Sequence, residues 1–98
     1  MPDRLDLATF HPRVGQTFDV EITERSSIQL TLTEANLGPW QPHDGPATAF
    51  ELLFQGPSDP ILPQATYRLT HADLGPLDIF IVPIGQSNDG TTYQAVFN

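Results

Sequence analysis

The 98-residue sequence contains no cysteine and no lysine, and all four of its basic residues are arginines. The lack of cysteine excludes a disulfide framework, a cysteine-bound zinc ion, an iron–sulfur cluster and a thiol nucleophile. The lack of lysine excludes a Schiff-base lysine and the lysine of a phosphate-binding loop. These absences remove several large classes of enzyme and metalloprotein.

Basic charge is scarce overall, because twelve acidic residues face the four arginines and give a formal net charge of −8. Affinity for a nucleic-acid backbone comes from clustered Lys and Arg, so we expect no nucleic-acid partner. The longest apolar run is Ile79–Val82, far too short to span a membrane, and the first ten residues hold no apolar run of signal-peptide length. We therefore expect no membrane partner, and a protein located in the cytoplasm or in a particle assembled there.

Apolar and polar residues alternate with a period of two along much of the chain, which is typical of strands with one wet face. A polar turn at Glu24–Ser27 separates the first two runs and predicts a hairpin, and Ser87–Gly90 is a strong turn signal before the last run. The expected strands cover residues 18–23, 28–33, 50–54, 66–71, 77–84 and 92–97.

A short helix is expected only at the N-terminus, where Asp3 can serve as the N-cap and Leu7, Phe10 and Val14 have near-helical spacing. Pro12 ends it after a turn or two. Six strands with one short helix predict a single all-β domain over residues 1–98, folded as an antiparallel barrel or sandwich. Two longer connections cover residues 35–49 and 56–65.

The sequence provides little catalytic chemistry. The three histidines share no metal-ligand spacing, and we expect no metal, no cofactor and no catalytic constellation. His71 shares a strand face with Tyr67 and precedes Asp73 by two residues. It can be read as a base oriented by the carboxylate, or as a buried histidine hydrogen-bonded across a turn, which we favour.

Apolar side chains also occur on the face of the strands that should be wet, and they are the most informative feature of the sequence. Leu53, Phe80, Val82 and Val96 oppose the expected core residues of their strands. In one interpretation, Leu7, Phe10 and Val14 or the 35–49 connection cover them. In the other, together with Trp40, they form a surface that binds another copy or another protein.

Several motifs resemble a small bacterial family described as a domain of unknown function. These motifs are F-x-L-L-F-x-G-P at 50–57, L-P-Q-x-x-Y-R-L-x-H at 62–71, F-I-V-P-I-G at 80–85 and Y-Q-A-V-F-N at 93–98. Phe10, Val14-Gly15 and Phe18 fit its looser N-terminal pattern, and the resemblance is weak between residues 24 and 49. Genes of this family often lie near genes for proteins similar to phage tail-collar or tail-fibre components. The resemblance therefore implies a structural or assembly role, and no catalytic residue is carried over.

Three functions follow, in decreasing order of preference. The first is a non-enzymatic interaction module, a component or assembly factor of a phage-tail-like particle, that binds a protein partner or itself through Trp40, Leu53, Phe80, Val82 and Val96. The second is a ligand-binding barrel with Tyr67, His71 and Trp40 around a small cavity. The third is a hydrolase that uses His71 and Asp73.

Overall fold

The computed structural model describes residues 7–38 and 49–97. A short helix α1 (Leu7–Phe10) and a 3₁₀ turn η1 (His11–Arg13) precede six strands. The strands are β1 (Thr17–Thr23), β2 (Ser26–Leu37), β3 (Phe50–Gly56), β4 (Ala65–His71), β5 (Gly75–Ser87) and β6 (Gly90–Phe97). The expected N-terminal helix is thus present, whereas its expected N-cap, Asp3, lies outside the described residues.

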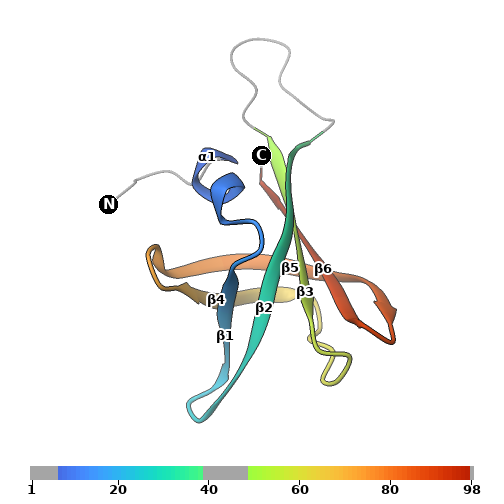
Figure 1. The fold of residues 1–98 in the computed structure, drawn as a ribbon. Coiled ribbons are helices and arrows are strands. Elements are labelled where there is room, and N and C mark those ends of the chain that lie inside the picture. Colours follow the sequence, from blue (N-terminus) through green and yellow to red (C-terminus); the bar gives the residue numbers. More distant parts are fainter. Residues whose placement is uncertain (1–6, 39–48, 98) are drawn as a thin grey trace.

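The six strands form one closed antiparallel barrel in the order β1-β2-β3-β6-β5-β4 (Figure 1). This confirms the all-β expectation and decides between its two forms, barrel and sandwich. Each half is a meander, β1 to β3 and β4 to β6. The meanders meet at a long seam, where β3 pairs with β6 at seven positions, and at a short seam, where β1 pairs with β4 at two.

The strands extend further than the alternating runs indicate. Ser26 and Ser27 belong to β2, so the predicted four-residue turn shrinks to Glu24 and Arg25. β2 also continues to Leu37 because a register shift between Leu32 and Glu34 changes which positions face inward. The connection expected over residues 35–49 therefore begins later than predicted.

The barrel interior is a packed apolar core. Twelve large side chains are under 2% exposed, and they include Phe10, Phe18, Phe54 and Tyr93. Phe10 of α1 contacts Phe18, Phe50 and Phe97, with ring centroids 5.9 to 6.4 Å apart. The helix thus closes one end of the barrel from inside the core. The expectation that Phe10 covers outward-facing apolar residues is wrong, because the ring packs against inward-facing aromatic residues.

The β3–β4 connection contributes to the core at another point. Leu62 is buried, and its backbone N–H donates a hydrogen bond of 2.9 Å to the phenol oxygen of the fully buried Tyr93. Gly56 packs so closely that a Cβ there would lie 2.5 Å from Leu30 Cδ2. The β3–β4 connection is therefore anchored to the core at Leu62 by one apolar and one polar contact.

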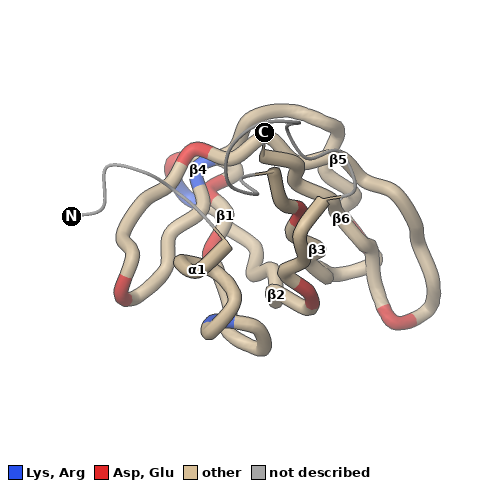
Figure 2. Tube along the Cα trace, turned by 90° about the horizontal axis from the view of Figure 1, so that it is seen from above, with Lys and Arg blue, Asp and Glu red and all other residues tan. Residues whose placement is uncertain are grey.

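Charged residues are spread around the outside of the barrel. Figure 2 shows acidic residues at separate places along the trace, including the hairpin turns. The described residues contain one ion pair, between Arg68 Nε and Asp78 Oδ1 at 3.5 Å, with both side chains well exposed. An exposed pair of this kind contributes little to stability. No helix in the described part of the chain has the length and apolar character to cross a membrane.

Candidate outer wall for partner binding

Four of the five residues expected to bind a partner lie on the outside of neighbouring strands β3, β6 and β5. Gln94 of β6 is opposite Leu53 on one side and opposite Val82 on the other. Val96 follows Gln94 by two residues on β6, and Phe80 precedes Val82 by two residues on β5, so both share this outward face. We call Leu53, Phe80, Val82, Gln94 and Val96 the outer wall.

The outer wall combines exposed apolar side chains with one hydrogen-bonded polar pair. Phe80 is 52% exposed and Val96 is 44% exposed, while Leu53 and Val82 are partly buried. Gln94 Nε2 donates a hydrogen bond of 2.8 Å to Glu51 Oε2, and Glu51 lies opposite Val96. The Gln94 amide, between Leu53 and Val82, is thus bonded to the Glu51 carboxylate at the β3 border of the wall.

Ile84 was missed by the sequence reasoning, although it is 51% exposed on the same strand as Phe80 and Val82. It lies at the register shift between Pro83 and Gly85, a bulge near the end of the apolar run. Its place two residues after Val82 was the available signal, because alternate residues of a strand share a face.

The charge of the wall is of one sign. Strands β3, β5 and β6 contain no arginine, and their charged residues are Glu51 and Asp78. Asp78 is paired with Arg68 of β4, so Glu51 carries the uncompensated charge beside the apolar groups. Glu34 of β2, opposite Leu53, adds a second carboxylate at the border. The wall therefore has a negative rim.

Trp40, the remaining residue expected at the partner surface and in the ligand site, lies outside the described residues.

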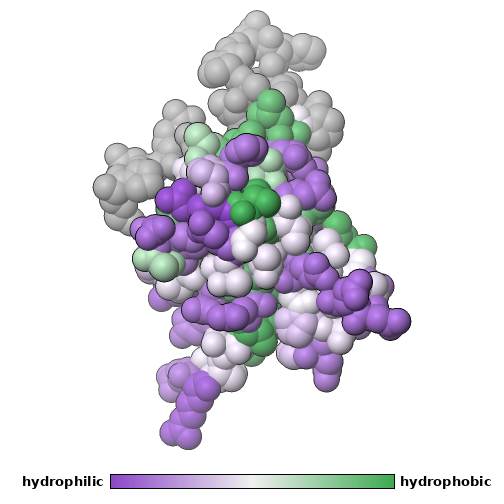
Figure 3. Space-filling model, viewed as in Figure 1, coloured by the Kyte–Doolittle hydropathy of each residue, from purple (hydrophilic) through white to green (hydrophobic). Residues whose placement is uncertain are grey.

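Figure 3 shows one face of the molecule in the orientation of Figure 1. Apolar residues appear there as small separate areas between polar and charged ones. Apolar exposure on that face is thus scattered, as is normal for a protein surface.

Tyr67 and His71 both face inward on β4, as their spacing indicates, but they do not meet around a cavity. The fully buried Leu69 lies between them, and their separation of four positions along the strand corresponds to about 13 Å. The Tyr67 hydroxyl donates a 2.7 Å hydrogen bond to the Pro63 carbonyl. Burial raises the pKa of the Tyr67 phenol above its ordinary value, and the nearby Tyr93 raises it further.

His71 is a buried histidine whose two ring nitrogens are both engaged. Its Nδ1 accepts hydrogen bonds from the backbone N–H groups of Asp73 at 3.0 Å and Leu74 at 3.3 Å. An accepting Nδ1 requires the neutral Nε2–H tautomer, so Nε2 donates to Gln16 Oε1 at 2.6 Å. The ring also packs on Phe18, with centroids 4.8 Å apart. Its contact with Asp73 is through the backbone, and this is the turn-bridging arrangement that the sequence favoured.

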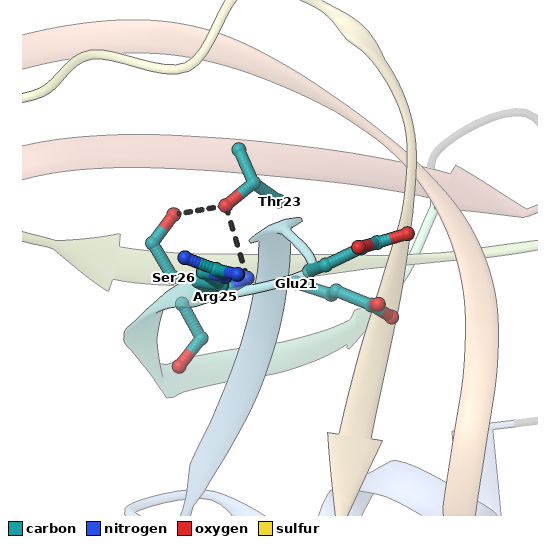
Figure 4. A pocket seen from close by; sticks show the side chains of 6 residues that line it. Glu21, Thr23, Arg25 and Ser26 are labelled. Carbon is teal, nitrogen blue, oxygen red and sulfur yellow. Dashed lines mark hydrogen bonds between the residues drawn. The ribbon is translucent and has the colours of Figure 1, made fainter.

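A hollow of about 290 Å³ lies at the end of the β1–β2 hairpin and is lined by Glu21, Thr23, Glu24, Arg25, Ser26 and Ser27. In Figure 4 the labelled side chains stay close to the hairpin from which they come. The Thr23 hydroxyl bonds the Ser26 hydroxyl at 2.9 Å and accepts from the Arg25 N–H at 3.2 Å. These bonds shape the turn itself. Within the described ranges, no three His, Asp or Glu residues are grouped to hold a metal ion.

A family model described as "Domain of unknown function (DUF6916)" matches residues 5–97, which is nearly the whole chain. The chain belongs to this family. The DUF6916 match includes every strand of the barrel and all four apolar residues of the outer wall. No curated protein and no solved structure matches the chain.

Proposed function

We propose that this DUF6916 domain is a non-enzymatic interaction module that binds a protein partner through the outer wall. The observation that carries the proposal is the placement of Leu53, Val82, Val96 and Phe80 on adjacent strands around Gln94. Covering apolar surface of this kind is favourable by about 25 cal/mol per Å² removed from water. Residues used for binding must stay exposed in the free protein, as Phe80 and Val96 do.

The rim of the wall favours a foreign partner over a second copy. Two copies packed wall to wall about a two-fold axis that crosses the strands would set Glu34 and Glu51 of one copy against the same carboxylates of the other. Like charges in a closing interface cost several kcal/mol, and each copy also carries a net charge of −8. A partner with an apolar centre and basic residues around it is complementary to the wall.

A phage-tail-like particle, as component or as assembly factor, is the setting that we propose for this module. The support is the family resemblance and the character of the surface, because assembly proteins work through contacts with other proteins.

The described residues offer no observation that favours a ligand-binding barrel or a hydrolase, since both ring nitrogens of His71 are already bonded and Tyr67 lies apart from it.

The test compares four forms of the tagged protein as bait in a lysate of the native host: wild type, Phe80→Asp, Val82→Asp and Gln29→Asp. Gln29 is exposed on β2, outside the wall, so its substitution adds the same charge elsewhere. We expect one protein, identified by mass spectrometry, to be retained by the wild type and by Gln29→Asp and lost by both wall variants. All four should remain folded by circular dichroism.

Equal retention of that protein by all four forms would show that the wall is not the binding surface. Light scattering on the purified wild type at high concentration tests the foreign-partner argument separately. We expect a monomer, whereas a dimer that Val82→Asp dissociates would assign the wall to self-association.

A further inference from the structure

The short seam leaves part of a strand edge open. β1 and β4 pair only where Asp19 meets Thr70 and Val20 meets Leu69. Figure 1 shows the two strands crossing steeply, so that the end of β1 and the start of β4 move apart beyond these positions. Continued register would place Glu21 opposite Arg68, but no pairing exists there. The barrel is therefore closed along only a small part of this seam.

The open part of β4 is the stretch from Ala65 to Arg68, which we call the β4 edge. On one side each of its residues pairs with β5, from Ala65 opposite Ile81 to Arg68 opposite Asp78. On the other side, no backbone pairing or turn hydrogen bond among the described residues reaches it. Every second residue of a strand directs its N–H and C=O to that side, so the β4 edge presents a short row of unpaired donors and acceptors.

Apolar side chains beside the separation are incompletely covered. On β1 the inward-facing Phe18 and Val20 are 0% exposed, whereas Ile22, at the register shift between Glu21 and Thr23, is 37% exposed. Tyr67 faces inward from the β4 edge and is likewise only partly buried. On the outward face, Thr66 of the edge lies opposite Phe80 of the outer wall. A strand placed here would find apolar contacts on the inner side as well as backbone partners.

We propose that the β4 edge binds an extended segment of a partner protein as an added strand, with apolar residues at alternate positions and basic residues between them. Backbone donors and acceptors in a row are matched by another strand, which supplies hydrogen bonds independent of its sequence. The alternate apolar side chains would face Tyr67, with the half-exposed Ile22 of β1 nearby. The basic residues follow from charge, since Glu21 lies on β1 beside the opening, Arg68 of the edge is already paired with Asp78, and the whole chain is acidic.

This proposal goes beyond the outer wall, because it depends on backbone groups of β4 and on none of the wall side chains. Four synthetic seven-residue peptides test it by NMR titration of the ¹⁵N-labelled full chain. The first alternates valine and lysine, and the second alternates valine and glutamate. The third and fourth repeat the first with N-methyl groups on alternate amides, along one edge of the peptide in the third and along the other edge in the fourth. Val82→Asp serves as a second protein sample.

We expect the valine–lysine peptide to shift the amide signals of Ala65–Arg68 and of their β5 partners, with the same affinity for wild type and Val82→Asp. N-methyl groups on the peptide edge that faces β4 remove about two hydrogen bonds. The methylated peptide that carries them on this edge should therefore bind roughly tenfold more weakly than the other methylated peptide. The valine–glutamate peptide should bind more weakly than the lysine peptide. Shifts located on the outer wall and lost in Val82→Asp, absence of any shift at β4, or equal binding of both methylated peptides would each overturn the proposal and leave the outer-wall hypothesis intact.

Discussion

The two seams that close the barrel differ in how the chain holds them. The long seam joins β3 to β6 at every position from Phe50 opposite Phe97 to Gly56 opposite Thr91. Its first pair is a stacked aromatic pair, with centroids 4.5 Å apart and planes within 5° of parallel. The short seam has two backbone pairs. The barrel is thus closed by a continuous ladder on one side and by a brief crossing on the other.

Side chains compensate at the short seam for the missing ladder. His71 of β4 bonds Gln16, which directly precedes β1, and packs on Phe18 within β1. At the long seam, by contrast, the backbone ladder alone joins the two strands. The inward side chains there fill the core, and outward side chains contribute to the outer wall. The comparison indicates that a seam can be secured by backbone or by a buried polar side chain, and that the second solution leaves a strand edge open.

The largest effect is expected from Gly90→Ala at the end of the long seam. Gly90 has φ +139°, and a Cβ there would collide with the carbonyl oxygen of Gly56. The obstacle is backbone held in the β3–β6 ladder, so it cannot move aside cheaply. We expect the substitution to lower the free energy of unfolding by roughly 3 kcal/mol or more, measured by urea denaturation.

Gly75→Ala is the matched control, because Gly75 also has a positive φ, +75°, but a Cβ there would meet nothing within 4 Å. It carries only the conformational penalty, and we expect a loss of about 1 kcal/mol. Equal losses for the two variants would mean that the close approach of Gly90 to Gly56 is unimportant.

A smaller effect is expected from His71→Phe at the short seam. The new ring can keep the contact with Phe18, but the N–H groups of Asp73 and Leu74 lose their acceptor and Gln16 loses its donor. The loss of these three part-buried hydrogen bonds predicts a decrease of roughly 2 kcal/mol in the free energy of unfolding, measured by urea denaturation. Tyr67→Phe removes one hydrogen bond at a more exposed site of the same strand, and we expect it to cost about 0.5 kcal/mol. A His71 variant as stable as the Tyr67 variant would contradict the role given to the imidazole.

Local sequence patterns predicted the strands of this fold well, but they did not predict which strands pair to close the barrel. The alternation around Val20, Leu30 and Leu52 identified strands correctly because one face of each is buried. The same pattern is silent on which strand lies next to which, since β3 meets β6 and β1 meets β4 through contacts between distant parts of the chain. The register shifts in β2 and β5 interrupt the alternation, so the strands continue beyond the residues where the pattern ends.

The candidate site was predictable to the same extent. Outward positions of Leu53, Phe80, Val82 and Val96 follow from the alternation, but their gathering around Gln94 depends on the β3–β6–β5 order. The helical spacing of Phe10 predicts an apolar helix face, but it does not indicate which part of the protein that face contacts. Only the fold shows that the ring enters the end of the barrel.

Amide hydrogen exchange, read residue by residue by NMR, tests the contrast between the seams most directly. We predict that amides bonded across the long seam, from Leu52 to Gln55, exchange only through global unfolding. Of the amides of Asp19, Val20, Leu69 and Thr70 at the short seam, those that bond across it should exchange through a local opening of much lower free energy. Equal protection at both seams would contradict the account, because the short seam would then be held as firmly as the continuous ladder.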